Sequence, residues 1–128
     1  MGILLVKEGV EFGGVLHPAG ARILEVLKQV VASLDFDVTV TSARDGKHSG
    51  SGDPHHSGEA FDLRTKSLTA AQKQGLLQRL RAGLYREPTG PGRRFYAFLE
   101  SEGTANEHIH VQRRKGTTYT ILDYLASR

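Results

Sequence analysis

Residues 107–111 read Glu-His-Ile-His-Val, and this alternation of polar and apolar side chains is typical of a strand with one buried face. His108 and His110 then share one face of the strand, while Ile109 and Val111 point into the core. Residues 60–63, Ala-Phe-Asp-Leu, alternate in the same way. The two stretches therefore predict a sheet with one hydrophobic face and one face that carries polar side chains.

Two helices and several other strands are predicted around these stretches. Apolar residues recur at helical spacing after His17-Pro18, and again over residues 69–85, where Ser67 or Thr69 can cap the helix. Further strands are predicted at residues 3–6, 38–42 and 95–99. The tail, residues 117–127, fits either a strand or a short helix. Because the elements do not alternate regularly as β-α-β, we expect an α+β fold with a small antiparallel sheet and the helices packed on its hydrophobic face.

The length and composition restrict the chemistry that the chain can carry. The chain has 128 residues, which predicts one domain over residues 1–128, and 38% of them are hydrophobic. It has no cysteine, so disulfides, thiolate catalysis and cysteine-based metal sites are excluded. Any metal site must therefore use histidine and carboxylate ligands.

The histidines are concentrated in two short segments. Of the six, five lie in residues 48–56 and 108–110, close to carboxylates. The first segment leads into the pattern H-x-x-G-x-A-x-D, formed by His55, Gly58, Ala60 and Asp62. One loop histidine, one strand carboxylate and one strand histidine would make three metal ligands and leave a fourth position for water. That is the pattern of a catalytic rather than a structural zinc site.

The combination of H-x-x-G-x-A-x-D with a later H-x-H resembles the zinc-dependent D-alanyl-D-alanine carboxypeptidase family, which includes peptidoglycan-cleaving phage endolysins, and the related hedgehog signalling domain. The resemblance covers residues 38–112 and implies that His55, Asp62 and His110 bind Zn²⁺. Asp53 stands where the family usually has serine. The family likeness also implies a fold in which the sheet carries the zinc site on the face away from the helices.

Two glutamates are candidates for the catalytic base. Glu107 lies three residues before His110, the E-x-x-H spacing of the carboxypeptidase branch, and we favour it. An ideal strand, however, would place Glu107 and His110 on opposite faces, unless the strand has a bulge there or begins only at residue 108. Glu100 is the alternative, because the hedgehog branch has its acidic residue on the preceding strand.

Three further residues are candidates for substrate contacts. His108 shares the face of His110 and either donates to an oxyanion, as a catalytic residue, or only supports the metal ligands. Arg44 follows a predicted strand, and the resemblance implies that it binds a substrate carboxylate; a loop arginine bonding backbone carbonyls is the alternative. His48 resembles the hedgehog loop histidine and is expected to face the site.

The resemblance implies a zinc metallopeptidase that hydrolyses peptide bonds in peptidoglycan stem peptides, as a carboxypeptidase or an endolysin. The alternative is a non-catalytic, hedgehog-like zinc-binding recognition module. The net charge of +3 suits an anionic partner, but no nucleic-acid-binding motif is evident, so we expect no nucleic acid partner. With neither a signal peptide nor a membrane-spanning segment, we expect a soluble monomer, cytoplasmic in its producer and released by lysis or carried by a phage particle.

Overall fold

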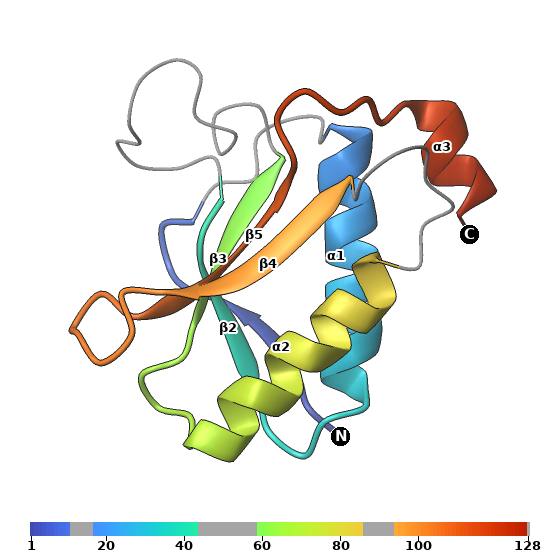
Figure 1. Ribbon diagram of the computed structural model, residues 1–128. Helices are drawn as coiled ribbons and strands as arrows, with labels where there is room; N and C mark the ends of the chain where they lie inside the picture. The colour runs from blue at the N-terminus through green and yellow to red at the C-terminus, as the bar shows by residue number, and fades with distance from the viewer. Residues whose placement is uncertain (11–16, 44–58, 86–93, 128) are drawn as a thin grey trace.

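The computed structural model describes residues 1–10, 17–43, 59–85 and 94–127, which form an α+β fold (Figure 1). The strands of the described residues are β1 (Leu4–Val6), β2 (Val38–Ser42), β3 (Ala60–Arg64), β4 (Phe95–Glu100) and β5 (His108–Arg113). The helices are α1 (Pro18–Ala32), α2 (Ala70–Leu84) and α3 (Ile121–Ala126). The predicted α+β class is confirmed, and the tail forms a helix rather than a strand.

The strands form one sheet in the order β1-β2-β3-β5-β4. β2 pairs with β3, β3 with β5 and β5 with β4, all antiparallel, but β1 pairs with β2 in parallel. The expectation of a purely antiparallel sheet is therefore wrong. The reason is that α1 connects β1 to β2, and a helical crossover returns the chain in the same direction.

The helices begin where their capping residues predict. The side chain of His17 accepts a hydrogen bond from the backbone of Ala19, and Pro18 occupies the first turn of α1. Thr69, rather than Ser67, caps α2 and forms a reciprocal capping box with Gln72. Within the described residues, none of the helices is long and apolar enough to cross a lipid bilayer.

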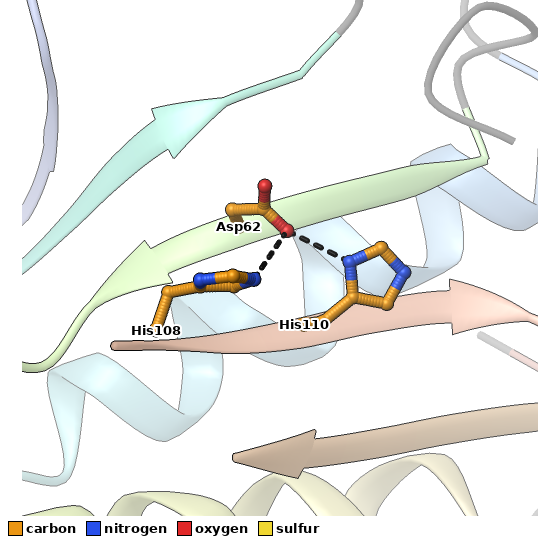
Figure 2. Close-up of side chains that lie close together, drawn as sticks. All are labelled: Asp62, His108 and His110. Atoms are coloured by element: carbon orange, nitrogen blue, oxygen red, sulfur yellow. Dashed lines mark hydrogen bonds and ion pairs between the residues drawn. The ribbon is translucent and has the colours of Figure 1, made fainter. Parts of the chain in front are cut away.

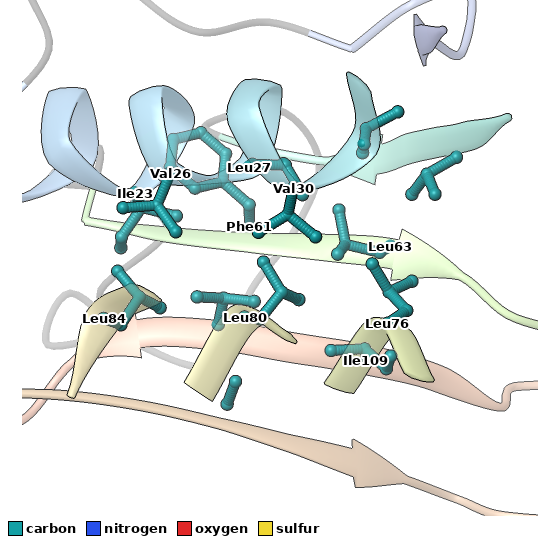
Figure 3. Close-up of a cluster of buried hydrophobic side chains, with 14 of the residues drawn as sticks. Ile23, Val26, Leu27, Val30, Phe61, Leu63, Leu76, Leu80, Leu84 and Ile109 are labelled. Atoms are coloured by element: carbon teal, nitrogen blue, oxygen red, sulfur yellow. The ribbon is translucent and has the colours of Figure 1, made fainter. Parts of the chain in front are cut away.

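The hydrophobic core lies between the sheet and the helices α1 and α2 (Figure 3). The two helices also contact each other, and Gly83 allows a close approach: a Cβ atom at this position would lie 2.6 Å from Cγ1 of Val26. The largest side chains that are almost fully buried are Phe61, Phe95, Ile23, Leu27, Leu63, Leu76, Leu80, Leu84 and Ile109. Since this packing occupies one face of the sheet, the other face remains available for polar side chains.

The outer edge of β4 is covered by α2. Arg81 donates from Nε to the carbonyl of Ala97 at 2.9 Å, and the amide of Ala97 donates to the hydroxyl of Tyr85 at 3.2 Å. These side chains satisfy backbone groups that would otherwise be open to another strand. They also fix β4 against the helix layer, which holds the sheet in place at one side of the polar face.

Candidate metal centre

The polar face of the sheet brings Asp62, His108 and His110 together. Alternate residues of β3 and β5 belong to the core, so the residues between them point to the opposite face. Asp62 lies directly opposite His110 in the β3–β5 ladder, and His108 follows on the same face. The strand pattern predicted from the sequence is thus the reason that these three side chains meet.

The three side chains offer donor atoms in a small space (Figure 2). Oδ1 of Asp62 lies 2.8 Å from Nδ1 of His110 and 3.7 Å from Nε2 of His108. One ligand atom from each residue can be chosen so that all three lie within 4.8 Å of one another. His110 is buried, whereas Asp62 and His108 are half-buried.

The protonation of His110 follows from its outer neighbour, Gln112. The side-chain nitrogen of Gln112 donates to the carbonyl of Arg113 at 3.0 Å, and a carbonyl only accepts. The amide oxygen of Gln112 therefore faces His110, 2.6 Å from Nε2. Since this oxygen also only accepts, Nε2 carries a proton, and Nδ1 is the atom presented to Asp62.

His108 is oriented in the same manner by the backbone. Its Nδ1 lies 2.6 Å from the carbonyl oxygen of Asn106, so Nδ1 carries the proton and Nε2 faces Asp62. A neutral ring in this tautomer is an acceptor or a metal ligand at Nε2. It can donate to an oxyanion, the role predicted from the sequence, only when the ring is protonated.

The arrangement requires a positive charge between His110 and Asp62. With a neutral His110 ring, Nδ1 and the carboxylate oxygen would be two acceptors at 2.8 Å. Burial, the largest single influence, lowers the pKa of His110, but the hydrogen bonds to Asp62 and Gln112 and the charges of Asp62 and Glu100 together raise it by more, so the net pKa lies above its usual value. A proton or a metal ion can supply this charge. Two imidazole nitrogens and a carboxylate oxygen are a donor set that suits Zn²⁺.

Glu100 is the glutamate that the structure brings to this cluster. It pairs with His108 across the β4–β5 ladder. Its Oε1 lies 3.7 Å from Nδ1 of His110 and 3.9 Å from Nε2 of His108, the two nitrogens that face Asp62. The side chain is 36% exposed, so it is also in contact with solvent.

Glu107, the base favoured from motif spacing, is engaged elsewhere. Its carboxylate accepts hydrogen bonds from Nζ of Lys73 at 2.8 Å, the hydroxyl of Thr65 at 2.6 Å and the amide of Gly103 at 3.2 Å. The bonds from Lys73 and Thr65 lower the pKa of Glu107 to about 2. Among the described residues, Glu100 rather than Glu107 therefore lies within ion-pair distance of the two histidines. Glu107 links α2 and the end of β3 to the hairpin that carries Glu100 and His108.

Two aromatic residues of β4 border the cluster. Tyr96 and Phe98 are stacked with ring centroids 5.2 Å apart, and the ring of Phe98 lies 5.7 Å from that of His110. Both are half-buried. Both rings contact the His110 ring from the side of β4.

Three predicted site residues, Arg44, His48 and His55, lie outside the described residues. Asp62, His108, His110 and Glu100 are brought together as a group. Sequence reasoning missed Gln112, although its position two residues after His110 places it on the same strand face. That spacing was the available signal.

We compared the chain with protein-family models, curated proteins and solved structures, and none of them matches it.

Proposed function

We propose that this chain is a zinc-dependent peptidase that hydrolyses peptide bonds in peptidoglycan stem peptides, as a carboxypeptidase or an endolysin. One observation carries the proposal: Asp62, His108 and His110 direct three donor atoms to one place, and an oxygen acceptor holds the far nitrogen of each ring. Metal-binding histidines are typically held in this way. The substrate class comes from the motif resemblance of His55, Asp62 and His110 to the carboxypeptidase and endolysin family.

Asp62 and His110 belong both to the ligand set implied by the motif and to the cluster in the structure. The third ligand is either His55, as the motif implies, or His108, which lies beside the other two. Three protein ligands leave one position for water or substrate. When bound, a zinc ion supplies Lewis-acid chemistry, which acidifies water and polarises a peptide carbonyl.

In this proposal Glu100 moves the proton. Its carboxylate lies beside the nitrogens of His108 and His110 and is open to solvent. It takes a proton from the attacking water and delivers that proton to the nitrogen of the leaving amine. Asp62 holds the proton or cation next to His110, and the stacked aromatic rings of β4 limit the access of water to that ring.

The test has two parts, metal content and hydrolysis. Elemental analysis of protein purified without chelator is expected to give about one zinc per chain, and the zinc form is expected to release new amino termini from purified muropeptides. Glu100→Gln is expected to retain zinc and to lose activity by about 10²- to 10⁴-fold. Glu102→Gln, in the same hairpin and exposed, is the matched control and is expected to remain active.

The same experiment separates the peptidase from the alternative. If the zinc-loaded chain leaves muropeptides intact, the chain is not a peptidase of this class, and a hedgehog-like recognition module becomes the better explanation. If Glu100→Gln remains active while Glu107→Gln folds, binds zinc and is inactive, the base is Glu107.

A further inference from the structure

A cleft of about 600 Å³ opens beside the metal centre on the polar side of the sheet. Asp62 and His108 line one part of it. The rest is lined by β2, by the end of β3, by the segments that follow β1 and β3, and by the hairpin between β4 and β5; its charged residues are Lys7, Arg64, Lys66 and Glu107. Its volume lies in the range of pockets that hold a ligand the size of a short peptide.

Three cationic side chains in this cleft have no partner in the described part of the chain. Lys7, Arg64 and Lys66 are all exposed, and none of their side chains makes a hydrogen bond or ion pair with a described residue. The two acidic residues of the cleft, in contrast, are already engaged. Asp62 faces the two histidines, and Glu107 is bound by Lys73 and Thr65. The cleft therefore has a local excess of positive charge.

Arg64 is the cation nearest to the metal centre along the sheet. It lies directly opposite His108 in the β3–β5 ladder, on the same face as Asp62, two residues away along β3. Lys66 follows two residues later and lines the same cleft. An extended ligand that reaches the histidines would thus pass the guanidinium group, which is suited to bidentate binding of a carboxylate.

We infer that this cleft is an anion subsite, in which Arg64 and Lys66 bind a carboxylate of a peptide whose backbone extends to the metal centre. The inference rests on the proposed function and specifies its substrate class: an acidic peptide with a carboxylate close to the bond that reaches the histidines. The subsite is distinct from the role expected of Arg44. A phosphate group shares the chemistry of a carboxylate in such a site, so the test must separate the two.

The test is binding of matched peptides to the metal-free chain, in which no turnover complicates the measurement. N-acetylated, C-amidated Ala-Glu-Ala and Ala-Gln-Ala differ only in one carboxylate, and inorganic phosphate serves as the third probe. Titrations followed by NMR are expected to show Ala-Glu-Ala binding about three- to tenfold more tightly than Ala-Gln-Ala at low salt, as expected for exposed charge pairs. The difference is expected to shrink as the salt concentration rises.

The preference is expected to disappear in the double variant Arg64→Gln/Lys66→Gln. The matched control is Lys28→Gln/Lys115→Gln, which removes the same charge from exposed positions outside the cleft and is expected to keep the preference. Equal binding of the two peptides, or a preference that survives in the Arg64 and Lys66 variant, overturns the inference. If phosphate binds more tightly than Ala-Glu-Ala, the inference that the ligand is a peptide is overturned.

Failure of this inference can be distinguished from failure of the proposed function. A chain that binds zinc and cleaves muropeptides but does not distinguish the two peptides retains the peptidase proposal and loses the anion subsite. A chain that prefers Ala-Glu-Ala but leaves muropeptides intact in the zinc form retains the subsite and loses the peptidase proposal.

Discussion

Replacing Gln112 tests whether the hydrogen bond behind His110 prepares the ring for a metal ion. Gln112 is only 5% exposed, and its amide oxygen accepts from Nε2 of His110 at 2.6 Å. Gln112→Met preserves the length of the side chain but removes this acceptor. The proton of His110 is then free to occupy Nδ1, which is the nitrogen that faces Asp62.

Two independent magnitudes agree on the size of the effect. A buried donor left without an acceptor costs about 1–3 kcal/mol. Loss of a group that orients a metal-binding histidine typically costs about 10- to 100-fold in metal affinity, which corresponds to about 1.4–2.8 kcal/mol. We therefore expect Gln112→Met to raise the zinc Kd by about 10- to 100-fold.

The assay is competition for zinc with a chromophoric chelator, and Gln112→Glu is the matched variant. Both substitutions remove the bond from Gln112 to the carbonyl of Arg113, but only Gln112→Met removes the acceptor for His110. Gln112→Glu is therefore expected to bind zinc more tightly than Gln112→Met. Equal zinc affinities in both variants and in the unmodified chain would refute the reasoning.

Four further predictions concern the ligands and the charged groups. His55→Ala and His108→Ala identify the third ligand. The variant that removes this ligand is expected to lower zinc affinity, measured by chelator competition, by more than the roughly 100-fold lost when a residue that only orients a ligand is replaced. If neither variant loses affinity, both proposed ligand sets are wrong. Because zinc must displace the proton between His110 and Asp62, zinc affinity is expected to rise with pH up to the raised pKa of His110 and then level off. The free energy of unfolding of the metal-free chain is expected to fall as the pH rises, and urea titrations at several pH values measure it. The raised pKa of His110 stabilises the fold fully below the ordinary value of 6.5, and this contribution is lost as the pH rises through the raised value. Glu107→Gln is expected to unfold at lower urea concentration than the unmodified chain at pH 7. It is also expected to lose less stability as the pH falls from 4.5 to about 2, because the carboxylate of Glu107 stabilises the fold only while it is charged. If the variant and the unmodified chain lose the same stability over this pH range, Glu107 does not stabilise the fold in this way.

The parts of the fold that could be predicted from the sequence are those set by local periodicity. Residues 60–63 and 108–111 alternate with a period of two, so the face of each of these side chains follows from the sequence alone, without knowledge of how the strands pair. The start of α1 is predicted by His17-Pro18 and that of α2 by Ser67 or Thr69, of which Thr69 is the cap, because capping depends on residues within one turn. Asp62 and His110 lie 48 residues apart, and their expected grouping comes from the motif resemblance.

The parts that could not be predicted depend on contacts between distant residues. The parallel pairing of β1 involves three residues, too few to carry a pattern, and its direction is set by the helix that follows. Lys73 lies 34 residues from Glu107, and nothing in either local sequence indicates that they pair. The role of Gln112 depends on the direction of its amide group, which is determined by the carbonyl of Arg113.

The choice between Glu100 and Glu107 shows why motif spacing and strand geometry gave different answers. Glu107 matches a motif when residues are counted along the chain, but an odd separation from His110 places it on the opposite face of a regular strand. A bulge, or a strand that begins only at residue 108, would remove this restriction. β5 does begin at His108, but the carboxylate of Glu107 is held by Lys73, Thr65 and the amide of Gly103 instead of lying beside the histidines. The same ladder sets Glu100 opposite His108, although eight residues separate them along the chain. Distance across the sheet determines which carboxylate can exchange a proton at the histidines, and on that criterion the proposed base is Glu100.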